Sequence, residues 1–194
     1  VAIKGIGGFH IACDAENESA VSILRQRKRK SNKPLALMAG NVESIKRFAL
    51  VRKEEEKALT APERPIVLLN KLPHSSISPL VSPGNSRLGV MLPYSPLHYL
   101  LFEEGGFSAL IMTSGNIAEE PIITNNETAM KKLSDIADAF LIHDRDIFMR
   151  TDDSIINVFE DKPRLLRRSR GYVPFPVELP FNSKMEVLAV GGEL

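Results

Sequence analysis

Short apolar runs alternate with segments of helical periodicity along most of the chain. Continuous apolar runs bounded by turn residues predict buried strands. They lie at residues 1–3, 34–38, 65–69, 87–93, 108–114 and 139–144. Apolar residues at helical spacing predict helices over residues 17–29, after Asn41, over 53–59, after Ser95 and up to about residue 133.

Capping residues support the helix starts. Asp14 or Asn17 can begin the first helix, Asn41 the second, and Thr124 or Asn125 the last. Ser95 followed by Pro96 is typical of a helix start, and Leu97, Leu100 and Leu101 follow it at helical spacing.

The order of the elements indicates an α/β protein. Strands separated by helices favour a layered sheet, and two late strand patterns, 154–160 and 163–169, meet at a turn over 160–162. Such a hairpin makes the sheet mixed. Residues 71–86 are rich in Pro, Ser and Gly and predict a surface loop. The proline-rich tail to residue 185 is expected to be extended.

Composition excludes several classes of protein. The 194 residues are 43% hydrophobic and 25% charged, as in an ordinary globular domain, and the net charge is +1. The single cysteine, Cys13, excludes an internal disulfide framework and a cysteine zinc cluster, and is expected to be a buried small hydrophobe. Because no apolar run approaches the ~20 residues of a membrane span, we expect a cytoplasmic protein without membrane contact.

Residues 25–33 carry the densest positive charge in the chain. The cations stand without an intervening acid and are Arg25, Arg27, Lys28, Arg29, Lys30 and Lys33. A solvated helix end is one interpretation, since cations suit the C-terminal dipole. A polyanion site is the other. A triphosphate fits it better than duplex nucleic acid, because the chain also contains 24 acids.

A polar turn ends the apolar strand 108–114. Ser114 and Asn116 flank Gly115 there, where open α/β sheets hold ligands. The stretch is either a plain turn or a hydrogen-bonding cradle.

The third candidate stretch, residues 143–154, is strongly charged. Asp144, Asp146, Asp152 and Asp153 could hold Mg²⁺, which takes one or two carboxylates together with substrate phosphates. A charged loop with internal ion pairs is the alternative.

In the fourth stretch, residues 164–172, an extended strand would place Arg168 and Arg170 on one face and Arg167 on the other. One of these faces could reach a phosphate.

Residues 4–15, KGIGGFHIACDA, fit neither familiar phosphate loop. His10 stands where the third glycine of a dinucleotide fingerprint belongs, and no Gly-Lys-Ser/Thr occurs. The glycines are needed either for positive φ or for close backbone approach to a ligand. Together, two cationic clusters, a polar turn and an acidic loop on one α/β scaffold predict a nucleotide site.

The series KGIGGFHIACDA, RKRKSNKPLALM, APERPIVLL, LGVMLPYSPLHYLL, MTSGNIAEEPI, HDRDIFMRTDDS and RRSRGYVP closely resembles the YrdC-like domain of HypF-type hydrogenase maturation carbamoyltransferases. The resemblance covers roughly residues 1–180. It implies a YrdC-like twisted mixed sheet flanked by helices, with a basic concave face. It also implies formation of carbamoyl-adenylate from ATP and a carbamoyl unit derived from carbamoyl phosphate, with ATP and Mg²⁺ as cofactors.

The resemblance also assigns residues. The family's Lys-x-Arg pair falls on Lys28 and Lys30, with Arg27 and Arg29 as the other register, and its Ser-x-Asn falls on Ser114 and Asn116. Phosphate contacts are implied near Lys33, Asp153 and Ser154, with Arg168 and Arg170 as further nucleotide-binding candidates. The small-substrate pocket would be lined by Lys4, Gly7, Gly8 and His10. Asp152 is the remaining candidate for Mg²⁺.

The resemblance further implies domain order and partners. Residues 1–183 would form the carbamoyl-adenylate-forming domain, and residues 184–194, with EVLAVGGEL, would begin a Kae-type domain. The start within a strand, without an initiator methionine, suggests a piece of a longer polypeptide that carries the other HypF domains in cis. HypE would accept the carbamoyl group. The alternatives are a double-stranded RNA or tRNA-binding module, which the neutral net charge disfavours, and a threonylcarbamoyl-adenylate synthase of the wider YrdC family.

Overall fold

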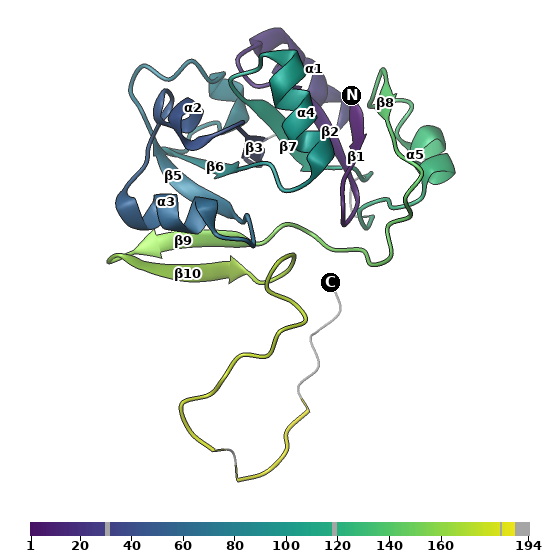
Figure 1. Ribbon diagram of the computed structural model, residues 1–194. Helices are drawn as coiled ribbons and strands as arrows, with labels where there is room; N and C mark the ends of the chain where they lie inside the picture. Colours follow the sequence, from purple (N-terminus) through teal and green to yellow (C-terminus); the bar gives the residue numbers. More distant parts are fainter. Residues whose placement is uncertain (30–31, 118–119, 183, 189–194) are drawn as a thin grey trace.

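The structure is a computed structural model that describes residues 1–29, 32–117, 120–182 and 184–188. Within these ranges the strands form one sheet and the helices pack against it (Figure 1). The strands are β1 (Ala2–Lys4), β2 (Phe9–Asp14), β3 (Leu37–Met38), β4 (Ala49–Leu50), β5 (Ile66–Lys71), β6 (Arg87–Met91), β7 (Leu110–Ser114), β8 (Phe140–Leu141), β9 (Ile155–Phe159) and β10 (Lys162–Arg167). The helices are α1 (Glu18–Arg27), α2 (Val42–Lys46), α3 (Lys53–Thr60), α4 (Pro96–Gly105) and α5 (Asn126–Lys132).

The sheet is mixed, as the sequence predicts. Its order is β10-β9-β5-β6-β3-β7-β2-β1-β8, and β4 pairs with β5 beside this path. The pairs β1–β8, β3–β6 and β5–β9 are parallel, whereas the other pairs are antiparallel. The predicted hairpin joins β9 and β10, where Glu160 and Asp161 both have positive φ. Two successive residues with positive φ match the twist of a two-residue hairpin turn.

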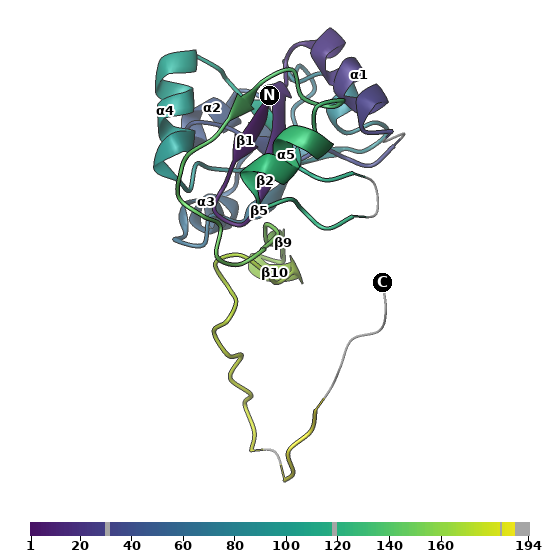
Figure 2. The same cartoon turned by 90° about the vertical axis from the view of Figure 1, so that its right-hand side faces the viewer.

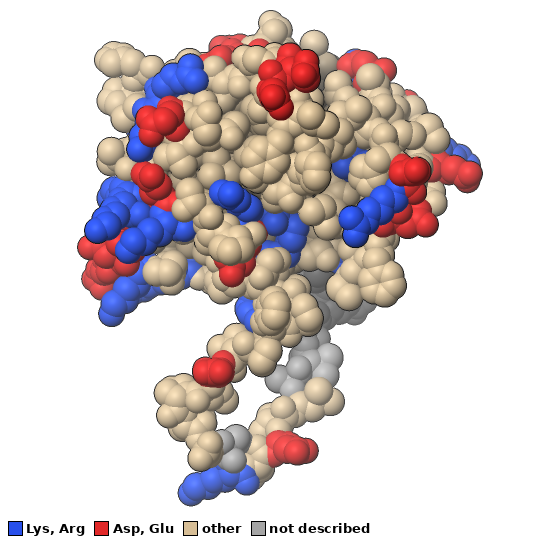
Figure 3. Space-filling model, viewed as in Figure 1, with Lys and Arg blue, Asp and Glu red and all other residues tan. Residues whose placement is uncertain are grey.

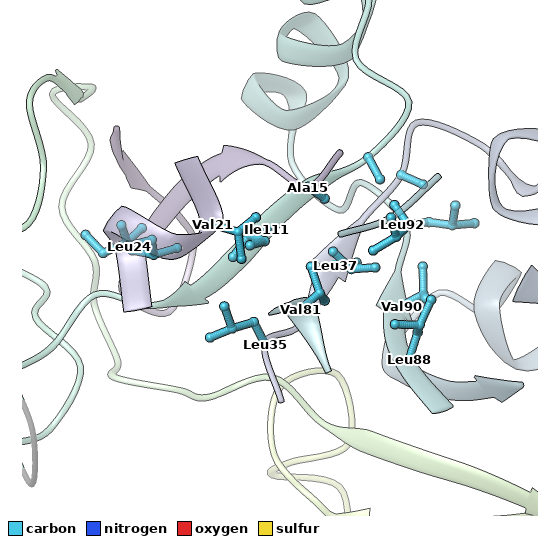
Figure 4. Close-up of a cluster of buried hydrophobic side chains, with 14 of the residues drawn as sticks. Ala15, Val21, Leu24, Leu35, Leu37, Val81, Leu88, Val90, Leu92 and Ile111 are labelled. Atoms are coloured by element: carbon cyan, nitrogen blue, oxygen red, sulfur yellow. The ribbon is translucent and has the colours of Figure 1, made fainter. Parts of the chain in front are cut away.

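Alternation along the strands divides the core between the two faces of the sheet. Ile11 and Ile111 belong to the larger cluster, and their neighbours Ala12 and Met112 belong to the smaller one. The larger cluster receives the buried side chains of α1, α2, α3 and α5, and Figure 4 shows part of it around Val21. Helix α4 covers the other face with Leu97, Leu101 and Phe102. The alternation of side chains along each strand therefore decides which of them contact the helices on either face of the sheet.

The predicted helix starts are confirmed at four positions. The side chains of Asn17, Asn41, Ser95 and Asn125 each accept a hydrogen bond from a backbone N–H three residues on. These residues satisfy donors that have no partner inside the helix.

Two local predictions need correction. The apolar run 34–38 pairs only over Leu37–Met38. Strand β10 ends at Arg167, and residues 170–172 form a turn around Gly171, whose φ is +85°. Arg168 and Arg170 therefore do not share a strand face. The turn brings the Arg170 guanidinium to the backbone carbonyls of Glu63 and Arg64.

Beyond the turn the described chain contains no further strand or helix and leaves the body, as both views show (Figures 1 and 2). The extended proline-rich tail is thus confirmed. Residues 189–194, on which the prediction of a following domain mostly rests, lie outside the described residues. Across the part of the chain that is described, no helix has the length and apolar character needed to cross a membrane.

Candidate functional site

Lys28 meets the polar turn after β7. Its Nζ donates to the carbonyl oxygen of Ser114 and, at 3.3 Å, to Oδ1 of Asn116. Ser114 Oγ donates to the same Asn116 Oδ1 at 2.8 Å, and Asn116 Nδ2 donates to the Glu120 carbonyl at 2.7 Å. The structure thus joins the cationic stretch to the Ser-x-Asn turn, 86 residues away. We call Lys28, Ser114 and Asn116 the polar cradle.

The other cations of this stretch point elsewhere. Arg27 binds Asp138 at 2.7 Å and the carbonyl of Ile136, and Arg25 binds the carbonyls of Leu80, Val81 and Lys33. The side chains of Arg29 and Lys33 are exposed, and Lys30 lies outside the described residues. Of the two registers left open by the sequence, the one containing Lys28 therefore reaches the cradle.

A buried carboxylate links two more candidates. Asp153 Oδ2 lies 3.1 Å from Nε2 of His10, and its Oδ1 accepts from Nε of Arg170 at 2.8 Å. The three side chains are only 10%, 5% and 12% exposed. Burial raises the pKa of Asp153, but the hydrogen bonds from His10 and Arg170 and the charge of Arg170 outweigh it and hold this pKa below its usual value. Asp153 is therefore ionised.

Two aromatic side chains that sequence reasoning missed enclose this group. The Arg170 guanidinium lies 3.5 Å from the ring centroid of Tyr94, and the His98 ring stands edge-on to Tyr94 at 4.5 Å. Burial lowers the pKa of His98 to about 3, so its ring is neutral. The signal for His98 was a polar residue among the apolar positions of a helix that starts at Ser95.

The cradle and the buried carboxylate lie side by side. His10 on β2 pairs directly with Ser114 on β7, so their side chains share one face of the sheet. Lys28 contacts the Ser114 carbonyl, Ser114 is the strand partner of His10, and His10 contacts Asp153. Candidates from four separate stretches of sequence thus form one continuous site.

The glycines of residues 5–8 form the turn between β1 and β2, where Gly5 N–H donates to the Gly8 carbonyl. None of Gly5, Gly7 and Gly8 has positive φ, which excludes one of the two explanations above. Glycine is needed here because the backbone of the turn packs closely against other parts of the protein. A Cβ on Gly7 would lie 2.3 Å from the Thr151 carbonyl oxygen, and one on Gly8 would lie 2.5 Å from Ile122.

The glycine turn nevertheless borders a cavity of about 330 Å³. Arg170 connects the cavity to the buried carboxylate. The lining comes from the turn, from the segment between β8 and β9 and from Arg170, and comprises Gly5, Ile6, Gly7, His143, Arg145, Asp146, Ile147, Phe148, Met149, Thr151 and Arg170.

Lys4 does not share a pocket with His10. In the β1–β2 ladder Lys4 faces Phe9 and Ile3 faces His10, so Lys4 and His10 lie on opposite faces of the sheet. The buried Lys4 Nζ donates to the His143 carbonyl at 3.0 Å. The prediction of one pocket containing both side chains is wrong, because adjacent strand positions alternate between faces.

The acidic residues of 143–154 do not gather. No group of three or more His, Cys, Asp or Glu side chains that could hold a metal ion occurs among the residues that the structure describes. Asp144, Asp146 and Asp152 are exposed, whereas Asp153 binds His10 and Arg170. A Mg²⁺ site formed by this loop alone is therefore not supported. A Mg²⁺ ion bound to nucleotide phosphates remains compatible with the loop, because such an ion needs only one or two carboxylates in addition to the phosphates.

The remaining phosphate candidates make contacts within the protein. Ser154 Oγ donates to the Arg170 carbonyl and accepts from the Ser169 N–H at 2.8 Å. Arg168 donates to the carbonyls of Tyr172 and Phe175. On the face that Figure 3 shows, cations and acids are interspersed, with cations most frequent near α3, β9 and β10. The basic concave face stays a prediction.

The chain is similar to characterised proteins over its whole length. The Sua5_yciO_yrdC family model, described as "Telomere recombination", matches residues 1–169. Carbamoyltransferase HypF of Rhodobacter capsulatus is 47% identical over 196 residues, which cover all of this chain and 26% of that protein. The chain spans about a quarter of the length of the curated relatives it matches.

Solved structures agree. The crystal structure of full-length HypF in the phosphate- and nucleotide-bound form has a TM-score of 0.88 and 49% identity, over 92% of this chain and 28% of that one. Pyrococcus abyssi Sua5 complexed with L-threonine has a TM-score of 0.75 at 19% identity, over 87% of this chain and 49% of that one, which shows the fold alone. The predicted α/β fold, a twisted mixed sheet flanked by helices, is confirmed.

Proposed function

This chain belongs to the Sua5–YciO–YrdC family, and from that premise we propose that it forms carbamoyl-adenylate from ATP and a carbamoyl unit derived from carbamoyl phosphate. The reaction would be one step of carbamoyl transfer in nickel–iron hydrogenase maturation. The other domains of a HypF-type protein would act in cis, and HypE would accept the carbamoyl group.

One observation carries the proposal. The Lys28 ammonium is held against Ser114 and Asn116, on the strand pair that also carries His10. A cation beside a hydroxyl and an amide suits a triphosphate, and the adjacent histidine suits a small polar group. The nucleotide-bound HypF structure, at 49% identity, supports binding of a nucleotide by this fold.

The reaction asks the protein mainly for positioning and charge neutralisation. A carbamate oxygen attacks the α-phosphorus of ATP, the bond to the β-phosphate oxygen breaks, and pyrophosphate leaves with the electron pair. Lys28 would neutralise phosphate charge, and Ser114 and Asn116 would orient the nucleotide. Mg²⁺, when bound with ATP, would supply further neutralisation, and the exposed Asp152 would be its candidate carboxylate ligand. No covalent intermediate with the protein is required.

Pyrophosphate release by the 194-residue chain tests the proposal. ATP and Mg²⁺ are supplied with ammonium bicarbonate, which provides carbamate, or with carbamoyl phosphate. We expect release with carbamate and little with carbamoyl phosphate, because generating the carbamoyl unit is assigned to another part of HypF-type proteins. Full turnover with carbamoyl phosphate alone would contradict this division of labour.

The alternatives give different outcomes in the same assay. Release that requires L-threonine and bicarbonate, and not carbamate, would identify a threonylcarbamoyl-adenylate synthase. An RNA-binding module would release no pyrophosphate and would bind double-stranded RNA or tRNA with a steep dependence on salt.

A further inference from the structure

We infer that Asp153 and Arg170 are positioning residues that fix the His10 imidazole in one tautomer, with Nε2 protonated and Nδ1 free to accept an N–H of the carbamoyl substrate. The inference deepens the proposed function and rests on it for the identity of the substrate. Its structural part, the tautomer, can be measured separately.

The tautomer follows from the hydrogen bond to Asp153. An ionised carboxylate can only accept hydrogen bonds, so the contact of 3.1 Å requires a proton on His10 Nε2. In a neutral imidazole the other nitrogen then carries a lone pair. Nδ1 is buried and has no hydrogen-bond partner within the described residues. A buried acceptor without a partner is unfavourable, and a hydrogen bond from a substrate N–H would remove that penalty.

Arg170 holds the carboxylate in place. Nε donates to Asp153 at 2.8 Å, while Nη1 and Nη2 donate to the carbonyls of Glu63 and Arg64, each at 2.9 Å. The guanidinium also packs on Tyr94 at 3.5 Å. The Arg170 guanidinium is therefore fixed by hydrogen bonds at all three nitrogens and by the Tyr94 ring at one face. Because its Nε cannot turn away, it holds the Asp153 carboxylate in one orientation. The predicted role of Arg170 in gripping phosphate is thereby replaced by support of Asp153.

The glycine turn packs directly beside the lone pair. A Cβ on Gly5 would lie 3.1 Å from His10 Nδ1 and 2.8 Å from the Gly8 carbonyl oxygen, so a side chain at this position would cover the nitrogen and displace the turn. Gly5 also lines the cavity of about 330 Å³. Among the described residues, Gly5 and Gly7 of the turn line this cavity and His10 lies behind them, so the turn must move aside when a small N–H group reaches Nδ1. The amino group of carbamate has this chemistry, whereas bicarbonate has no N–H.

Nitrogen NMR of the ¹⁵N-labelled chain tests the tautomer without any assay of turnover. At pH 8 we expect His10 to show a protonated Nε2 and an unprotonated Nδ1. In Asp153→Asn the amide can donate to Nε2, so the proton should move to Nδ1. Asp135→Asn removes an exposed aspartate that forms no hydrogen bond or ion pair with His10, Asp153 or Arg170 in the described part of the chain; it is the matched control and should leave the spectrum unchanged. A proton on Nδ1 of the unsubstituted chain, or no change in Asp153→Asn, overturns the inference.

Two further measurements test the substrate contact. With ATP and ammonium bicarbonate, the Nδ1 resonance should shift as the nitrogen accepts a hydrogen bond, and sodium bicarbonate at the same concentration and pH should leave it unmoved. An identical response to both salts contradicts the contact. Asp153→Asn should lower kcat with carbamate about tenfold or more while KM for ATP stays within about twofold. A folded variant with normal kcat also overturns the inference, whereas absence of turnover in the unsubstituted chain counts against the proposed function alone.

Discussion

Asp153 Oδ2 lies 3.1 Å from His10 Nε2, although the two residues are 143 positions apart in the sequence. Four strands stand between β9, which follows Asp153, and β2, which carries His10. Five strand spacings of a flat sheet would be about 24 Å. The sheet must therefore twist and curve, and the segment between β8 and β9 crosses from one edge toward the other (Figure 1). The contact thus joins the segment before β9 to the part of the site that lies on β2 and β7.

Removing the polar cradle should weaken ATP binding. In Lys28→Ala combined with Ser114→Ala, the ammonium and the hydroxyl that face Asn116 are lost. Calorimetry with ATP and Mg²⁺ should show affinity at least about tenfold lower, or about 1.4 kcal/mol. The matched control is Arg27→Ala, since Arg27 binds Asp138 instead, and its affinity should be unchanged. Equal affinity in the double variant would contradict the cradle.

Asp153 should contribute to acid sensitivity. Its pKa in the folded protein is below that of the unfolded chain, so its contribution to stability is complete above the unfolded value near ~3.9 and is lost as pH falls toward the folded value. Between pH 6 and pH 3 we expect Asp153→Asn to lose about 1 kcal/mol less unfolding free energy than the original chain. Urea unfolding at both pH values measures this. Parallel losses in the two proteins would show that Asp153 titrates normally.

The Cys13 thiol should react slowly while the protein is folded. Burial raises its pKa to about 11, so the thiolate is scarce at pH 8. Alkylation by iodoacetamide should be about a hundredfold slower than expected for the reference value of 9.0. The same chain in urea is the control and should react at the ordinary rate. Fast alkylation under native conditions would contradict the expectation of an inert, packed cysteine.

Gly7→Ala should destabilise the fold. The new Cβ would lie 2.3 Å from the Thr151 carbonyl oxygen, and a backbone atom cannot move aside as easily as a side chain. Thermal unfolding should report a loss of about 1–3 kcal/mol. At Gly40 the nearest atom to an added Cβ is Phe102 Cβ at 3.3 Å, so Gly40→Ala should cost much less. Similar losses at both positions would mean that the turn can shift away from Thr151.

Local patterns were sufficient for most elements. The helix starts at Asn17, Asn41, Ser95 and Asn125 and the hairpin at 160–161 depend on hydrogen bonds and φ values within a few residues, which the sequence specifies directly. The choice of Ser114 and Asn116 as a cradle also came from a local motif at a strand end. The pocket containing both Lys4 and His10 was implied by the family resemblance, and the register of β1 against β2 places the two side chains on opposite faces of the sheet.

The sequence by itself therefore determined the α/β class, the strands and helices, and the polar stretches from which a site is built. Only the tertiary structure decided which of these meet. His10, Asp153 and Arg170 come from three separate segments of the chain. The order of the strands and the curvature of the sheet bring them together. The same is true of Lys28, whose register depends on how α1 packs against β7. Such contacts depend on the path of the chain through the sheet, because no local periodicity records which distant segments meet.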